Sequence, residues 1–121
     1  MAMITSLKEN QIFVFGSNHA GNHAGGAAKQ AREMFGAQDG CGEGLTGRAY
    51  AFPTLRGNLA KCSDDMLALS RDRFFKFARH NLEKEFLMTA VGTGIAGFSM
   101  RKMKSLFATP PANVILPEEW R

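Results

Sequence analysis

Short apolar runs that suit buried strands alternate along this chain with segments that favour helices. Each run is a few residues long and is closed by glycine, proline or a polar turn, while the helical segments carry apolar residues at helical spacing. Such alternation predicts an α/β fold with three layers, a mainly parallel sheet with flanking helices. The expected strands are Ile12–Phe15, Ala49–Pro53, Phe86–Val91 and Asn113–Leu116, and the expected helices are Ala27–Phe35, Asp65–His80 and Ser99–Phe107.

Length and composition narrow the class of protein. A chain of 121 residues predicts one domain, 1–121, and 45% hydrophobic with 21% charged residues is ordinary for a globular protein. No apolar run approaches the ~20 residues that cross a bilayer, and the N-terminal stretch lacks the apolar core of a signal peptide. We therefore expect a cytoplasmic protein with no membrane partner, in which Cys41 and Cys62 are free thiols.

The positive charge of the chain is mild and scattered. The formal net charge is +4, and the densest basic group, RDRFFKFAR at Arg71–Arg79, has the pattern of the solvent face of an amphipathic helix. An alternative interpretation makes Arg71, Arg73, Lys76 and Arg79 a nucleic-acid surface. Because no aromatic residues are interleaved on an exposed face, nucleic acid is not the expected partner.

Three glycine-rich stretches interrupt the pattern, at Gly16–Gly26, Gly36–Gly47 and Gly92–Gly97. The first and third follow expected strands, so a parallel sheet brings both to the same edge, where ligands of open α/β sheets bind. Glycine loops that lead into helices expose N–H groups suited to phosphate. The third loop matches the GxGxxG spacing, although it lies late in the chain and no acidic residue follows at the expected distance. The alternative is that the glycines only make tight turns and close packing.

The first loop also carries polar side chains. Asn18 is placed to hydrogen-bond a ribose hydroxyl or to orient a water, and His19 or His23 could act as a general base. The alternative for the histidines is that one is exposed and the other caps the loop. Asp39, Cys41 and Glu43 in the second glycine stretch are weaker candidates for acid, base or nucleophile. The pattern predicts no metal site and no cofactor.

Three segments, in this order along the chain, resemble macrodomains, which bind ADP-ribose. They are GSNHAGNHAGGAAKQA, then GCGEGLTGRAYAFPT, and then VGTGIAGF, and the resemblance covers roughly 12–117. The pattern also resembles small bacterial and phage proteins with the same asparagine–glycine opening. The chain departs from macrodomains in being shorter, in lacking their leading strands and the early acidic residue that binds the adenine amine, and in having two histidines in the first loop.

The resemblance implies a minimal macrodomain-like fold and a set of ligand-binding residues. Asn18 matches the asparagine that faces the distal ribose. Gly25, Gly26 and Ala27 match the first phosphate loop. The second phosphate loop corresponds to Gly92, Thr93, Gly94, Ile95, Ala96 and Gly97, with Phe98 as the aromatic residue beside it. For Phe98, a place in the core is an equal alternative to stacking on a base or ribose.

The function implied by the resemblance is binding of ADP-ribose or a related nucleotide diphosphate, a small-molecule partner. Hydrolysis of an ADP-ribosyl bond stays open; in that mechanism Asn18 positions a water and His23 is the base. The alternatives are a non-catalytic sensor or sponge for a nucleotide signal and a nucleic-acid accessory protein. The sequence leaves the physiological ligand and the oligomeric state open.

Overall fold

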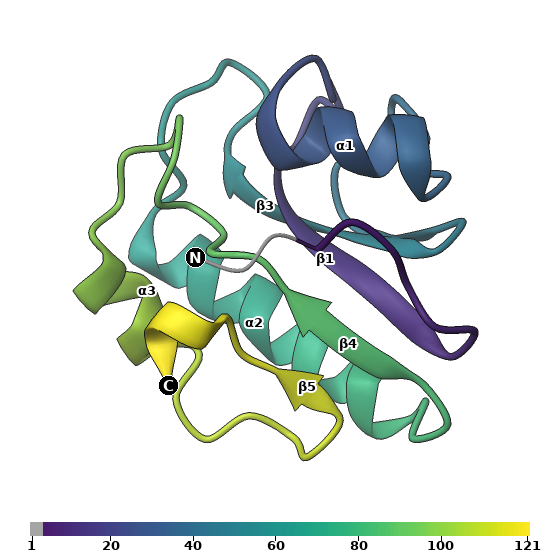
Figure 1. Cartoon of the computed structure of the whole chain (residues 1–121). Helices are drawn as coiled ribbons and strands as arrows, with labels where there is room; N and C mark the ends of the chain where they lie inside the picture. Colours follow the sequence, from purple (N-terminus) through teal and green to yellow (C-terminus); the bar gives the residue numbers. More distant parts are fainter. Residues whose placement is uncertain (1–3) are drawn as a thin grey trace.

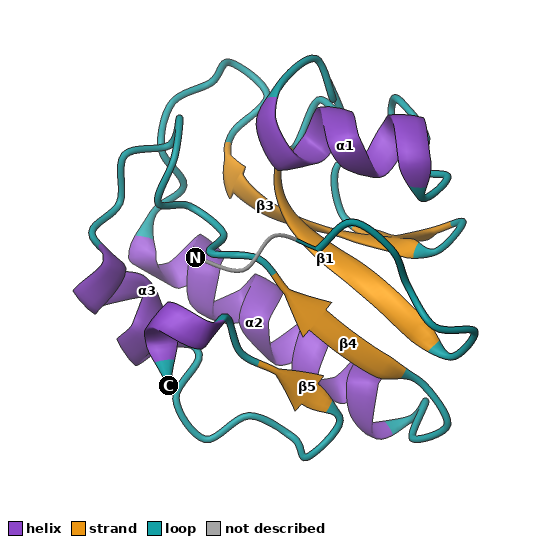
Figure 2. Ribbon diagram, in the orientation of Figure 1, coloured by secondary structure: helices purple, strands orange, loops and turns teal. Residues whose placement is uncertain are grey.

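The computed structural model describes residues 4–121, which form an α/β fold with a five-stranded sheet and three α-helices (Figure 2). Each expected strand and helix is present, with ends that differ by at most three residues. The elements, in chain order, are β1 (Gln11–Asn18), α1 (Gly26–Met34), β2 (Gly44–Thr46), β3 (Ala49–Leu55), α2 (Asp64–Arg79), β4 (Glu85–Met88), α3 (Met100–Leu106), β5 (Val114–Ile115) and the 3-10 helix η1 (Glu118–Trp120).

The sheet is mixed, which corrects the expectation of a mainly parallel one. Its strand order is β2-β3-β1-β4-β5, and β2 runs antiparallel to β3 while the other neighbouring pairs are parallel. Strand β2 lies inside the second glycine stretch, which was expected to be a loop. Gly47, with φ 58°, and Arg48 form a two-residue turn that returns the chain to β3. A glycine at the first position of such a turn suits the twist of a hairpin.

Helices lie on both faces of the sheet (Figure 1). On one face, Phe13 and Phe15 of β1 pack with Ala28 and Ala31 of α1. On the other face, a larger core joins residues of the strands to α2, α3 and η1, and its fully buried members include Phe52, Phe74, Phe86, Phe107 and Trp120. The alternation of β1 side chains between these two cores explains why its apolar run is unbroken.

The start of α2 follows from its sequence. Ser63 is the N-cap, and its hydroxyl accepts a hydrogen bond from the amide of Met66 at 3.2 Å. Asp64 and Asp65 occupy the first turn, where negative charge favours the helix dipole. His80 is the C-cap, as expected for a helix-end residue.

One part of the sheet is covered by no helix among residues 4–121. The α1 face of β4 and β5 presents Leu87 and Ile115, which pair in register and are half-buried. Helix α1 packs over β1 and leaves this strip free, while α2 and α3 occupy the opposite face. A cavity results, bordered by α1, the sheet and η1.

No helix within residues 4–121 is long and apolar enough to cross a membrane.

Candidate functional site

Two loops follow neighbouring parallel strands. Loop A (residues 19–25) joins β1 to α1, and loop B (residues 89–99) joins β4 to α3. Both lie at the end of the sheet toward which the arrows of β3 and β4 point (Figure 1). Their bases are in contact, because a Cβ added to Gly16 would lie 3.3 Å from the amide nitrogen of Gly92. Gly16 therefore permits close approach of the two chain segments and is part of β1 rather than of a loop.

Asn18 uses its side chain to close loop A. Its Nδ2 donates to the carbonyl oxygen of Asn22 at 3.0 Å, and its Oδ1 accepts from the Asn22 amide at 3.1 Å. The side chain is half-buried, and it keeps one Nδ2 proton and one lone pair on Oδ1 for another partner. This arrangement gives Asn18 a structural task in addition to the expected contact with a ribose.

His23, the expected general base, lies in the interior. It is 0% exposed, its ring meets Phe15 edge-on at 5.1 Å, and its Nε2 lies 3.1 Å from the carbonyl oxygen of Cys41. Its Nδ1 has no hydrogen-bond partner among the described residues. This placement favours the alternative in which a histidine holds the loop, while His19 is the exposed one.

We predict that His23→Ala lowers the free energy of unfolding by about 2–4 kcal/mol, because it leaves a cavity beside Phe15 and removes the contact with Cys41. Urea denaturation measures this change. His19→Ala is the matched control, and its exposed side chain predicts a change within about 0.5 kcal/mol. Equal stability of His23→Ala and the wild type would show that the ring does not hold the loop.

The second glycine stretch supports loop A. Its first part, the support loop (residues 36–43), packs against the backbone of residues 18–21. A Cβ on Gly21 would lie 2.4 Å from the carbonyl carbon of Gly40, and a Cβ on Gly42 would lie 2.4 Å from the carbonyl oxygen of Asn18. The Ser17 hydroxyl donates to the Gly42 carbonyl oxygen at 2.5 Å. Lack of space for a Cβ therefore explains Gly42, and it explains Gly21 together with the positive φ of 74° at that residue.

Side chains of the support loop are also engaged. Asp39 accepts from the amide of His23 at 3.3 Å, and the Glu43 carboxylate takes two hydrogen bonds from Arg73 of α2, at 2.8 and 2.9 Å. The hydrogen bond to Glu43 raises the pKa of the Arg73 guanidinium. Burial raises the pKa of the Tyr50 hydroxyl, and the negative charge of Glu43 adds to that rise. Cys41 and Cys62 are free thiols, as expected. The carboxylates of this loop hold the scaffold together.

The N-terminus of α1 offers amides without acceptors. Its N-cap, Gly25, supplies no side-chain cap, and the first turn contains no acidic residue. The amides of Gly26, Ala27 and Ala28 donate to no acceptor within residues 4–121. By contrast, Ser63 and Ser99 cap α2 and α3. An uncapped helix start carries partial positive charge and favours an anion.

Loop B has a similar set of amides. The amide of Gly97 donates a hydrogen bond to the carbonyl oxygen of Gly94, and the amide of Phe98 donates one to the carbonyl oxygen of Gly92. These two bonds fold the loop back on itself. Thr93 bonds the carbonyl oxygen of Ala90 through its hydroxyl at 2.7 Å. The three consecutive amides of Gly94, Ile95 and Ala96 find no acceptor in the described part of the chain, and the Ile95 side chain is 86% exposed.

Phe98 lies in the core rather than on a ligand surface. Its side chain is 9% exposed and belongs to the larger core cluster. The Nζ atoms of Lys61 and Lys102 each lie 5.2 Å from the ring centroid, in cation–π geometry. The alternative of a core role is thus the one that the structure favours for this residue.

The fold does not explain why residue 25 in loop A and residue 94 in loop B are glycines. Gly25 has extended torsions (φ −152°, ψ 168°), and Gly94 has no positive φ, so other residues could adopt both conformations. A Cβ added at either position meets no atom within 4 Å. Neither conformation nor packing requires glycine there, whereas close approach of a ligand to the backbone would.

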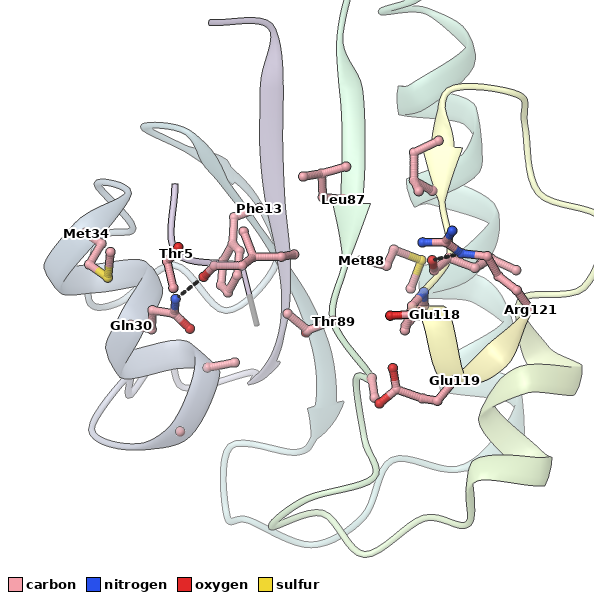
Figure 3. A pocket seen from close by; sticks show the side chains of 17 residues that line it. Thr5, Phe13, Gln30, Met34, Leu87, Met88, Thr89, Glu118, Glu119 and Arg121 are labelled. Atoms are coloured by element: carbon pink, nitrogen blue, oxygen red, sulfur yellow. Dashed lines mark hydrogen bonds between the residues drawn. The ribbon is translucent and has the colours of Figure 1, made fainter. Parts of the chain in front are cut away.

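A cavity of about 810 Å³ opens beside these amides (Figure 3). It extends from the start of α1, at Gly26 and Ala27, to the base of loop B, at Thr89 and Ala90, and does not include Gly92–Phe98. Its apolar surface comes from the uncovered strip of the sheet and from α1. The other wall of the cavity is formed by η1 and Arg121. The sequence did not predict this wall, because the Pro-Glu-Glu sequence at 117–119 indicates only that a strand ends there. The residues that line the cavity also include Gln30, Met34, Leu87, Ile115, Glu118 and Glu119.

Three of the basic side chains of α2 contact other side chains of the protein. Arg73 pairs with Glu43, Arg71 pairs with Asp72 at 2.9 Å, and the Arg79 guanidinium lies over the ring of Phe75 at 6.0 Å. These contacts favour the interpretation of this segment as the solvent face of an amphipathic helix.

Residues 4–121 contain no cluster of three or more histidine, cysteine, aspartate or glutamate side chains that could hold a metal ion. Comparison of the chain with protein-family models, curated proteins and solved structures gave no match. The resemblance to macrodomains therefore stays a prediction from the motifs.

Proposed function

We propose that this protein binds a nucleotide diphosphate of the ADP-ribose type, with the diphosphate at the amides of α1 and loop B. The observation that carries the proposal is the pair Gly25 and Gly94, where glycine serves neither the backbone conformation nor packing. Both glycines stand next to amides without acceptors. A diphosphate needs several N–H donors, and small residues around them let its oxygens reach the backbone.

The cavity supports the same proposal. Its volume of about 810 Å³ lies within the usual range of small-molecule sites, and its lining is mainly apolar with a few polar groups. Gly26 and Ala27 belong both to the helix start and to the cavity wall, so a ligand held at the amides can extend into the cavity. In this proposal the phosphates lie at the amides, and the base and ribose of the same nucleotide lie in the adjoining cavity.

The proposal concerns binding and does not include hydrolysis. His23, the expected base, is fully buried, and Asn18, which was expected to position a water, uses its side chain to close loop A. A sensor or sponge for a nucleotide signal fits this arrangement.

Calorimetric titration with ADP-ribose tests the proposal. We expect saturable binding of one molecule per chain, and ADP-ribose recovered intact from the mixture. Ribose 5-phosphate, which lacks the diphosphate and the base, should bind at least about tenfold more weakly. If ADP-ribose produced no binding heat and no change in melting temperature, the proposal would be wrong. Binding of RNA or DNA that weakens steeply with salt would favour the nucleic-acid alternative.

A further inference from the structure

A third loop lies at the same end of the sheet as loops A and B. Loop C (residues 56–62) joins β3 to α2, and Figure 1 shows it beside loop B. The amide of His19 in loop A donates to the carbonyl oxygen of Leu55, at the end of β3, at 3.0 Å. A Cβ added to Gly57 would lie 4.0 Å from the amide nitrogen of Ala20. Loop C is therefore a neighbour of both loops that carry the amides without acceptors.

The three loops differ in charge. Loops A and B contain no lysine, arginine, aspartate or glutamate, whereas loop C contains Arg56 and Lys61 and no acidic residue. A diphosphate carries full negative charge, and backbone amides offer only partial positive charge in return. A cation that reaches those amides from loop C would supply the missing charge.

The fold directs the side chain of Lys61 to loop B. Lys61 pairs with Leu55 in an antiparallel bridge, which fixes its backbone beside the end of β3. Its Nζ donates to the carbonyl oxygen of Gly97 at 3.3 Å and lies 5.2 Å from the ring centroid of Phe98. The amide of Gly97 in turn donates to the carbonyl oxygen of Gly94 at 3.0 Å. The ammonium group therefore lies against the turn that carries the free amides of loop B.

The ammonium group of Lys61 keeps donors for a ligand. It has three N–H groups, and the bond to Gly97 is its one hydrogen bond within residues 4–121. It forms no ion pair in that part of the chain, whereas Lys102, the other cation over Phe98, pairs with Asp64. Lys61 is also exposed, so an anion held at loop B has access to it.

We infer that Lys61 contacts the diphosphate held at loop B and supplies the positive charge that the amides of this loop lack. The inference rests on the proposed function and adds loop C to the site. A lysine ammonium binds phosphate as a point charge, so the contact needs proximity more than a fixed orientation. The same ammonium bridges the Gly97 carbonyl oxygen and a phosphate oxygen, and it thereby ties loop B to the ligand.

Calorimetric titration of Lys61→Met with ADP-ribose tests the inference, because methionine keeps most of the side-chain length and removes the charge. In about 50 mM NaCl we expect the variant to bind about five- to tenfold more weakly than the wild type, the effect of one charge-assisted hydrogen bond at an exposed position. In about 500 mM NaCl the difference should shrink to about twofold, because salt screens the ammonium. Lys61→Arg keeps the charge and should bind within about threefold of the wild type.

Lys76→Met is the matched control. Lys76 is exposed and lies in the last turn of α2, whereas loop C precedes the first turn of that helix. Loss of this charge should leave the affinity for ADP-ribose within about twofold of the wild type at both salt concentrations. An equal loss of affinity in Lys61→Met and Lys76→Met would show an effect of net charge alone and would overturn the inference.

The outcomes separate this inference from the proposed function. Wild-type affinity of Lys61→Met at the lower salt concentration would overturn the inference and leave diphosphate binding intact. A loss of affinity that is the same at both salt concentrations would show that Lys61 only holds loop B through Gly97, and it would also overturn the inference. Absence of ADP-ribose binding by the wild type would overturn the inference and the proposed function together.

Discussion

Gly42→Ala is expected to lower the free energy of unfolding by about 3 kcal/mol or more, and the melting temperature by ~10 °C. The added Cβ would lie 2.4 Å from the carbonyl oxygen of Asn18 and 2.7 Å from that of His19. Both neighbours are backbone atoms, so no side chain can move aside, and the support loop must separate from the end of β1. That movement would also break the hydrogen bond from the Ser17 hydroxyl to the Gly42 carbonyl oxygen.

Gly57→Ala is the matched control for this experiment. Gly57 has no positive φ, and its added Cβ finds its nearest neighbour, the amide nitrogen of Ala20, at 4.0 Å. The substitution should leave stability unchanged or raise it slightly, because alanine restricts the unfolded chain. Thermal unfolding followed by circular dichroism compares the variants. A Gly42→Ala protein as stable as Gly57→Ala would show that the support loop does not press against loop A.

Gly25→Ala and Gly94→Ala are expected to fold normally and to lose affinity for ADP-ribose. Each added methyl group points into open space in the protein, so the melting temperature should stay close to that of the wild type. In the complex the methyl group would occupy space beside a phosphate, and we expect about a tenfold loss of affinity for each variant. Because both methyl groups would crowd the same diphosphate, the double variant should lose more affinity than either single variant, up to about a hundredfold.

Calorimetry with ADP-ribose measures these affinities, and Gly57→Ala serves again as the control, since it lies in the loop after β3 and outside loops A and B. Wild-type affinity in the double variant would contradict the placement of the diphosphate. Loss of affinity in only one single variant would assign the diphosphate to that loop alone.

Local sequence patterns were sufficient to predict those helices and strands that their own residues determine. The helix predicted at Asp65–His80 is present as α2, and Ser63 followed by two aspartates makes its capped start. The apolar run of β1 predicted a strand buried on both faces. Its end was misjudged, because Ser17 and Asn18 are strand residues only through their pairing with Pro53 and Leu55 of β3.

Features that depend on tertiary contacts could not be predicted. Gly44–Thr46 has the composition of a loop, and its partner β3 makes it a strand. His23 and Asn22 are neighbours in a polar loop, yet one is buried against Phe15 while the other is exposed. Glu118 and Glu119 reach the cavity only because η1 folds back beside the uncovered strip of the sheet, which no local pattern indicates.

The most direct test of the account is a titration of the ¹⁵N-labelled protein with ADP-ribose, followed by amide resonances. The account predicts that the largest shifts occur at Gly26, Ala27 and Ala28 in α1 and at Gly94, Ile95 and Ala96 in loop B, with smaller shifts at Thr89 and Glu119. Shifts that gather instead on the basic face of α2, around Arg71 and Lys76, with the two sets of amides unchanged, would contradict it.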